Sequence, residues 1–281
     1  MRGYTTTDVA ELLGMSTARI RSFARAGLLS AKRSPHGEYR FSFHDVVLLR
    51  TAQELASARI HPRKVWRALR VLKAKLPNGQ PLTAVRIAAQ GDHIVVRDKR
   101  TSWHPESGQV TFDFSVSDLA DRAVPLVREA AEAAQRNEEA TSDDWYNIGL
   151  DFEVVAAVDE AQEAYRRATE LDPAHADAHV NLGRLLHAEG RVADAEFHYR
   201  QAVNVGPDNP TAQFNLGVAL EDLGCQEDAI NAYKQAITAD PHFADAHYNL
   251  AHLYEQSGNK SGAIRHFARY KTLTSVPSPS P

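Results

Sequence analysis

Arginine and lysine are concentrated near the N-terminus, and their side chains bind phosphate oxygens through charge and directed hydrogen bonds. Residues 1–76 contain 15 Lys and Arg against 5 Asp and Glu, a balance of +10. Residues 77–281 contain 17 against 31, a balance of −14. This division indicates an anionic partner for the basic end alone, although arginines are also simply solvated on many helices.

Two short helices joined by a glycine turn are expected to position the first of these arginines. Thr7 is a suitable N-cap for one helix and Ser16 for the next, while Gly14 and Gly27 are suited to end them. The apolar residues at helical spacing are Val9, Leu12, Leu13, Ile20, Phe23 and Ala24. Residues 28–41 then flank a turn at 34–37, which predicts a β-hairpin wing beside a helix-turn-helix.

This stretch resembles the winged helix-turn-helix of MerR-type transcription regulators. The matching pieces, within residues 3–75, are Tyr4-Thr5, Asp8 to Gly14, Arg19-Ile20-Arg21, Gly27-Leu28-Leu29 and Gly37 to Arg40. The resemblance implies that the helix 16–26 enters the major groove of double-stranded DNA, with the wing and a later helix on the backbone. The DNA-binding residues that it implies are Thr17, Arg19, Arg21, Ser22, Arg25, Lys32, Arg33, Tyr39, Arg40, Arg63 and Lys64.

Beyond the wing, Ser42 and Asp45 form a capping-box pattern that starts a helix running to about Ala58, and Pro62 suits the start of another. Residues 77–79 break that second helix. The long helix through which MerR-type proteins usually dimerise is therefore not evident, and a homodimer stays an open alternative. Apolar residues over 85–89, 93–97 and 109–114 instead predict a small antiparallel β module within residues 80–114.

Residues 115–141 are rich in Ala and Glu and predict a helical connector. Pro125 favours a kink or a restart over one unbroken helix, because proline removes a backbone donor and crowds the preceding turn. The apolar face of this connector is expected to comprise Val124, Leu126, Val127 and Ala131.

A 34-residue period runs through the second half of the chain. Proline recurs at 173, 207 and 241, small residues at 149, 183, 217 and 251, alanine at 161, 195, 229 and 263, and aromatic residues at 165, 199, 233 and 267. The pattern resembles the tetratricopeptide repeat (TPR), with four helix pairs over 142–275 that must stack on one another. Gly190, Gly224 and Gly258 are suited to end first helices, whereas Ala156 takes that place in the first repeat and predicts a looser turn.

By the same resemblance, the first helix of each repeat lines a groove that binds a partner protein or peptide. The predicted groove residues are Asn147, Asn181, Arg184, Asn215 and Asn249. The alternative is that asparagine is simply common at this repeat position. Basic residues are sparse beside these asparagines, which argues against a groove of the carboxylate-clamp kind.

Other chemistries lack their residues. The 13 histidines offer no third metal ligand at a suitable spacing, and the single cysteine, Cys225, excludes a disulfide framework and multi-cysteine metal sites. No nucleophile motif or phosphate loop is present, so we expect no enzyme, no metal and no cofactor. No apolar run suits a membrane span and residues 1–30 lack a signal-peptide core, so we expect a cytoplasmic, nucleoid-associated protein. The Ser- and Pro-rich residues 276–281 predict a disordered tail.

The sequence thus predicts a mainly α protein. A winged helix-turn-helix DNA-binding domain at 1–76 is followed by the small antiparallel β module at 80–114, the connector at 115–141 and a TPR α-solenoid at 142–275. The function predicted is a DNA-binding transcriptional regulator whose repeats bind a partner. The alternative is a TPR interaction scaffold whose N-terminal domain no longer binds DNA.

Overall fold

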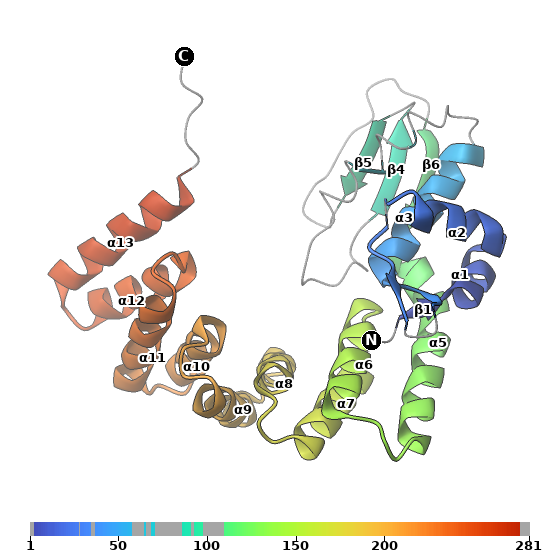
Figure 1. The fold of residues 1–281 in the computed structure, drawn as a ribbon. Helices are drawn as coiled ribbons and strands as arrows, with labels where there is room; N and C mark the ends of the chain where they lie inside the picture. The colour runs from blue at the N-terminus through green and yellow to red at the C-terminus, as the bar shows by residue number, and fades with distance from the viewer. Residues whose placement is uncertain are drawn as a thin grey trace. The chain divides into compact units, whose positions relative to one another are not determined.

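The computed structural model describes residues 3–27, 29–34, 37–57, 65, 69–70, 86–90, 93–97 and 110–275. The chain forms two compact units, residues 1–164 and residues 165–281. Figure 1 shows helix after helix along the chain, with two small sheets near the N-terminal end of the sequence. Among the described helices, none combines the length and the apolar character that crossing a membrane requires.

The N-terminal domain, called the head below, is a winged helix-turn-helix. Strand β1 (Tyr4–Thr5) precedes α1 (Thr6–Leu13) and α2 (Thr17–Arg25), and the wing is made of β2 (Lys32–Arg33) and β3 (Tyr39–Phe41). The three strands are antiparallel in the order β1-β3-β2. Helix α3 (Phe43–Ser57) follows. The predicted helices and hairpin are confirmed, whereas the pairing of β1 with β3 was not anticipated.

The first helix begins earlier than its predicted cap. Thr5, not Thr7, is the N-cap: its Oγ1 accepts from the Asp8 amide at 3.1 Å, and Asp8 Oδ2 accepts from the Thr5 amide at 2.7 Å. The prediction was wrong because it overlooked that an acid three residues after a threonine completes a capping box. Gly14 ends the helix with φ 65°, and Ser16 caps α2, both as predicted.

An apolar core supports these elements. The predicted core residues Val9, Leu12, Leu13 and Ile20 are buried, while Phe23 and Ala24 are half-buried. Ser42 and Asp45 exchange hydrogen bonds at the start of α3, and the second oxygen of Asp45 accepts from the Ser30 amide at 2.7 Å. Asp45 is only 1% exposed, so these bonds satisfy its carboxylate and tie the segment just before β2 to α3.

The predicted β module is present as a second antiparallel sheet. Its strands are β4 (Arg86–Gln90), β5 (His93–Arg97) and β6 (Val110–Ser115), in the order β5-β4-β6. Helix α3 contacts β6, and so does the helix that follows β6 in the chain.

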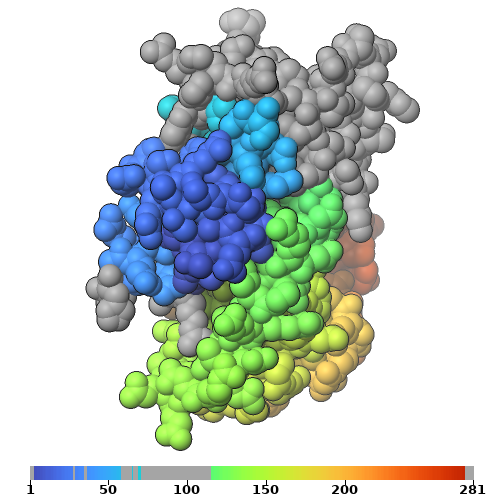
Figure 2. All heavy atoms as spheres, turned by 90° about the vertical axis from the view of Figure 1, so that its right-hand side faces the viewer, coloured from blue at the N-terminus to red at the C-terminus, as the bar shows by residue number. Residues whose placement is uncertain are grey.

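The connector is one helix, α5 (Val116–Arg136), which continues through Pro125. The predicted restart at Pro125 was therefore wrong, while the kink stays a prediction; of the predicted apolar face, Val127 is buried and Val124, Leu126 and Ala131 are half-buried. The fully buried residues follow a helical period, whereas the prediction took the apolar cluster beside the proline; they are Val116, Leu119, Ala120, Ala123, Val127 and Ala134. Helix α5 contacts α1 of the head on one side and α6 of the first repeat on the other, and Figure 2 shows it alongside the head.

Four helix pairs follow, as predicted. They are α6 (Ser142–Val154) with α7 (Val158–Leu171), α8 (Ala176–Ala188) with α9 (Val192–Val205), α10 (Pro210–Asp222) with α11 (Gln226–Ala239), and α12 (Ala244–Gln256) with α13 (Lys260–Thr274). Gly190, Gly224 and Gly258 end their helices at φ 80°, 76° and 79°. Ala156 adopts φ 57°, so the predicted looser turn was wrong: alanine accepts the strained left-handed backbone instead.

The small and aromatic rows of the repeat meet where two helices cross. A Cβ atom added to Gly183 would lie 2.7 Å from Cε1 of Tyr199, and one on Gly217 would lie 2.6 Å from Cε1 of Tyr233. Tyr165, Tyr199 and Tyr233 are almost fully buried. These crossings leave no room for a side chain, which explains the period of small residues in the sequence.

Candidate functional site

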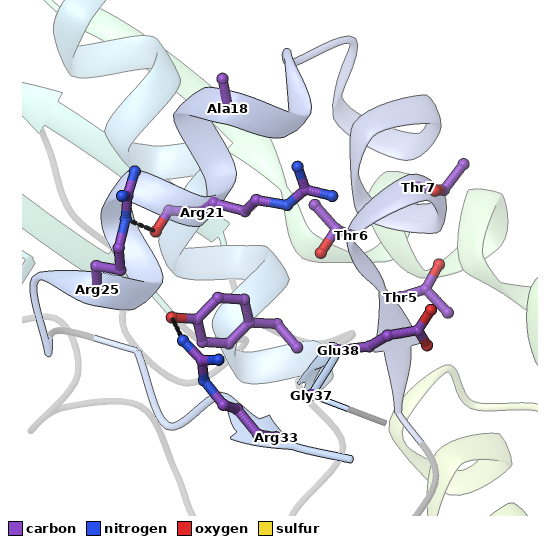
Figure 3. Close-up of a pocket in the computed structure, with 10 residues that line it drawn as sticks. Thr5, Thr6, Thr7, Ala18, Arg21, Arg25, Arg33, Gly37 and Glu38 are labelled. Carbon is purple, nitrogen blue, oxygen red and sulfur yellow. Dashed lines mark hydrogen bonds between the residues drawn. The ribbon is translucent and has the colours of Figure 1, made fainter. Parts of the chain in front are cut away.

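The surface of the head contains a hollow of about 620 Å³ between α2, the wing and the start of α1. Three of the predicted DNA-binding arginines, Arg21, Arg25 and Arg33, line it together with Tyr39. Figure 3 shows that the three arginines come from two separate elements, α2 and the wing, and lie around one space. The helix-turn-helix and the hairpin therefore bring together charges that lie well apart in the sequence.

The wing side of the hollow is built from Arg33 and Tyr39, which are paired across the hairpin. One guanidinium nitrogen of Arg33 donates to the Tyr39 hydroxyl at 3.0 Å, and the Arg33 guanidinium lies 4.7 Å from the centroid of the Tyr39 ring. The ring supports the guanidinium by a cation–π contact, and the hydrogen bond uses one of its five donors. The charge is thus held in place while its other donors can meet an anion.

The helix side is built from Arg21 and Arg25, which are four residues apart and therefore lie on one face of α2. Both are exposed, and Arg25 Nε donates to the Arg21 carbonyl at 3.4 Å. Glu38 also lines the hollow and brings one negative charge, but its carboxylate pairs with Arg40 at 3.1 Å. Three arginines in a hollow of this kind suit a phosphate-bearing ligand.

The other predicted residues of the head lie outside this hollow. Thr17, Arg19 and Ser22 belong to α2, where Ser22 Oγ donates to the Arg19 carbonyl at 2.7 Å. Lys32 is exposed on β2, and Arg40 is half-buried on β3. The predicted residues Arg63 and Lys64 lie outside the residues that the structure describes.

Sequence reasoning missed part of the lining. Thr5, Thr6 and Thr7 at the start of α1 line the hollow, as do Ala18, Gly37 and Glu38. The threonines reach it because β1 pairs with β3, which places the start of α1 beside the wing. A strand of two residues has no recognisable pattern, although Thr5 was noted in the motif that resembles MerR-type proteins.

The predicted groove asparagines occupy a second place, on the first helices of the repeats. The Asn181 amide nitrogen lies 3.3 Å from the Tyr165 hydroxyl, and the Asn249 amide nitrogen lies 3.1 Å from the Tyr233 hydroxyl. These two asparagines therefore stabilise the packing of successive repeats, while each amide keeps a carbonyl oxygen as an acceptor. Asn147 and Asn215 are half-buried, and Arg184 is exposed.

Among the residues that the structure describes, no group of three or more His, Cys, Asp or Glu side chains could hold a metal ion. Cys225 is exposed and is not in a disulfide.

Family models match both halves of the chain. Residues 4–72 match the MerR HTH family regulatory protein model. Tetratricopeptide repeat models match residues 157–216 and 244–274, and a TPR repeat model matches residues 222–258. These are non-catalytic kinds of domain. A search of curated proteins found no match.

Solved structures resemble the repeats. The crystal structure of MamA is 20% identical, with a TM-score of 0.50, and the match covers 56% of this chain and 90% of that one. MamA 41-end from Desulfovibrio magneticus RS-1 is 20% identical with a TM-score of 0.46, over 56% of this chain and 91% of that one. The similarity to the first concerns the fold of the C-terminal helices alone.

Proposed function

We propose that this chain, a MerR-type helix-turn-helix domain fused to tetratricopeptide repeats, is a DNA-binding transcription regulator whose repeats bind a partner protein or peptide. The observation that carries the proposal is the meeting of Arg21, Arg25 and Arg33 around one hollow on the outer surface of the head. An arginine that serves only to stabilise a fold is usually buried or paired with an acidic side chain. These three arginines are exposed. The basic balance of residues 1–76 agrees with the same partner.

In this proposal, α2 enters the major groove and the wing lies along the backbone. Arg19 and Arg21, with Thr17 and Ser22, would contact bases or phosphates. Arg33, held by the Tyr39 ring, would bind a phosphate through the guanidinium donors that the hydroxyl does not use. The α1 N-terminus, beside the same hollow, adds the positive end of a helix dipole.

The test is binding of the full chain to a labelled duplex of mixed sequence, followed by fluorescence anisotropy at low salt. Replacing Arg21 or Arg33 by Ala should weaken binding by about 1–3 kcal/mol each. The affinity of the wild-type chain should fall steeply as salt rises, since each phosphate contact releases counterions. Arg265→Ala is the matched control, because it removes one exposed arginine from α13, outside the head.

The alternative function is a TPR scaffold whose head contacts a protein instead of DNA. The pairing of Arg40 with Glu38 is the one contact that favours it, since that pair lowers the net charge of the wing. Two outcomes would favour the scaffold and contradict the regulator. One is duplex binding that is the same for the wild type and for Arg21→Ala and Arg33→Ala; the other is no binding of the wild-type chain at low salt.

A further inference from the structure

A second hollow, of about 310 Å³, lies on the repeats between α10 and α12. Val218, Glu221 and Asp222 line it from α10, and Tyr248, Asn249 and His252 line it from α12. The spacing of three and four residues puts each trio on one face of its helix. The hollow is thus formed by the first helices of two adjacent repeats, which belong to the same compact unit.

One wall of this hollow is aromatic and open. Tyr248 is 45% exposed, although its ring packs against Tyr270 with centroids 5.1 Å apart and against Phe267 at 5.9 Å. Val218, which lines the hollow from α10, is half-buried. Neighbouring rings fix one side of Tyr248, and its other side is open to solvent. The ring can therefore pack against a ligand with little loss of side-chain freedom.

The opposite wall carries two carboxylates that are held in place. Asn249 donates to the Tyr233 hydroxyl at 3.1 Å, and that hydroxyl donates to Glu221 Oε2 at 2.9 Å. Asp222 Oδ2 lies 2.8 Å from His187 Nε2 on the preceding repeat. Among the described residues, each of these bonds uses one oxygen of its carboxylate, so the other oxygen can accept from a ligand.

His252 does not neutralise the two acids. Its Nδ1 lies 3.1 Å from Gln256 Nε2, an amide nitrogen that can only donate. His252 Nδ1 therefore accepts, and in this arrangement the ring is neutral. The hollow then holds two negative charges beside an aromatic face and a short apolar wall.

We propose that this hollow is the recognition pocket for a lysine or arginine side chain of an extended partner peptide. The proposal deepens the partner-binding function proposed above for the repeats and rests on it. The alkyl stem of the basic residue would pack on Val218 and the Tyr248 ring, and its charged group would meet Glu221 and Asp222. Asn249, whose amide nitrogen is held by Tyr233, would offer its carbonyl oxygen to a peptide N–H.

Charge complementarity selects this occupant. An acidic or phosphorylated peptide would meet two carboxylates, and an uncharged one would leave them without a partner for their remaining oxygens. A purely apolar peptide would desolvate both acids without compensation. A basic residue with apolar neighbours would pair with the carboxylates and pack against the aromatic wall at the same time.

The experiment is selection of random nine-residue displayed peptides on the full chain, with anisotropy measurements on the enriched peptides after labelling. We expect Lys or Arg at one position of the enriched set. Changing that residue to Gln should weaken binding at least tenfold, and the Glu221→Gln, Asp222→Asn double variant should do the same. The matched control is Glu227→Gln, Asp228→Asn on α11, which removes two exposed adjacent charges and should change affinity less than twofold.

The outcomes separate the two proposals. Peptides that bind without a basic preference, or equally well to the double variant, would overturn the pocket and leave a partner-binding array. No enrichment by the wild-type chain would contradict peptide binding itself. A dimer of the chain alone, seen by sedimentation and dissolved by the double variant, would assign the pocket to a second copy and overturn the peptide proposal.

Discussion

The Nδ1 atoms of His179 and His198 lie 2.9 Å apart, and Nε2 of His179 lies 3.1 Å from the carbonyl oxygen of Pro173. Because a carbonyl only accepts, His179 Nε2 carries a hydrogen, and the Nδ1 of the neutral ring accepts from Nδ1–H of His198. The same pairing recurs two repeats later between His247 and His266, also at 2.9 Å. Each neutral pair already has one proton between its rings, so an extra proton can bind without breaking this bond only at Nε2 of the donor ring.

Burial lowers the pKa of His198 to about 4 and lowers the pKa of His179, His247 and His266 below the ordinary value. The groups whose charges act on the first pair are Asp172, His175, Arg166, Asp194 and Arg191, and those acting on the second are Arg269, Arg265 and Lys234. Since the folded state binds protons less readily than the unfolded chain, the stability present above about pH 6.5 is lost as the pH falls toward 4.

Chemical denaturation at pH 7.5 and pH 5 is expected to show this loss, at about 1–2 kcal/mol for the His179–His198 pair after allowance for the solvent access of His198, and in the same direction for the second pair. The chain offers its own control, because the third repeat has Gln213 and Ala232 at these two positions, and Gln213 donates to the Pro207 carbonyl at 3.0 Å. His179→Gln with His198→Ala copies that repeat and should reduce the pH dependence by the share of the first pair, leaving that of His247 and His266. An unchanged slope in the double variant would assign the effect to other groups.

Gly217→Leu is expected to destabilise the repeats by more than about 3 kcal/mol, because its Cβ alone would lie 2.6 Å from the buried ring of Tyr233. Thermal unfolding followed by circular dichroism measures the change. Gly206→Ala is the control, since a Cβ there would meet its nearest atom at 3.7 Å and the backbone has φ −128°. Similar losses in both variants would contradict a crossing that is specific to Gly217.

Ala156→Gly is expected to stabilise the chain by roughly 0.5–1 kcal/mol. Alanine at φ 57° carries the cost of the left-handed backbone, which exceeds the extra entropy that glycine gives the unfolded chain. The reverse change, Gly190→Ala at φ 80°, should destabilise by a similar amount, because a Cβ there meets no described atom within 4 Å and only backbone strain is added. A lower melting temperature for Ala156→Gly would show that the alanine methyl group makes a stabilising contact.

Asp151 on α6 provides a pH effect of opposite sign. Part of the residue keeps solvent access, but burial of its carboxyl raises the pKa to about 7. The contribution of this group to the free energy of unfolding is therefore fully present below the ordinary pKa near 3.8. It falls as the pH rises to about 7, where the buried carboxyl ionises. Asp151→Asn should raise the free energy of unfolding by roughly 1–2 kcal/mol at pH 8, after allowance for that solvent access, and by less at pH 5.

The control for this change is Asp159→Asn, which removes an exposed carboxylate from the start of α7 and should alter stability by about 0.5 kcal/mol or less. Denaturation curves at the two pH values are the measurement. A stabilisation by Asp151→Asn that is as large at pH 5 as at pH 8 would mean that ionisation is not its cause.

The elements that the sequence predicted well are those with several independent signals. The 34-residue period specified the repeats because proline, glycine, alanine and aromatic residues each repeat it, and the turn glycines at 190, 224 and 258 adopt positive φ as expected. Pairings between distant segments were harder to predict. The strand β1 has two residues, and its contact with β3 depends on the folded head.

The candidate site divides in the same way. The arginines of α2 and the wing could be proposed from residue type and motif, but which of them share a hollow depends on how the hairpin packs. Arg40 was grouped with them, yet it pairs with Glu38. Pro125 and Ala156 misled prediction for a common reason: tertiary packing overrides a local backbone preference of a few kcal/mol.

The unbroken course of α5 through Pro125 has a mechanical consequence. A helix of 21 residues spans about 31 Å, and this one touches α1 of the head as well as α6 of the first repeat. Helical hydrogen bonds, except the one that Pro125 cannot donate, restrain its backbone torsions, so its two neighbours are joined by a continuous helix. A pull that tilts the first helix pair would therefore tilt or bend α5, and the strain would reach α1, the helix directly before the turn into α2.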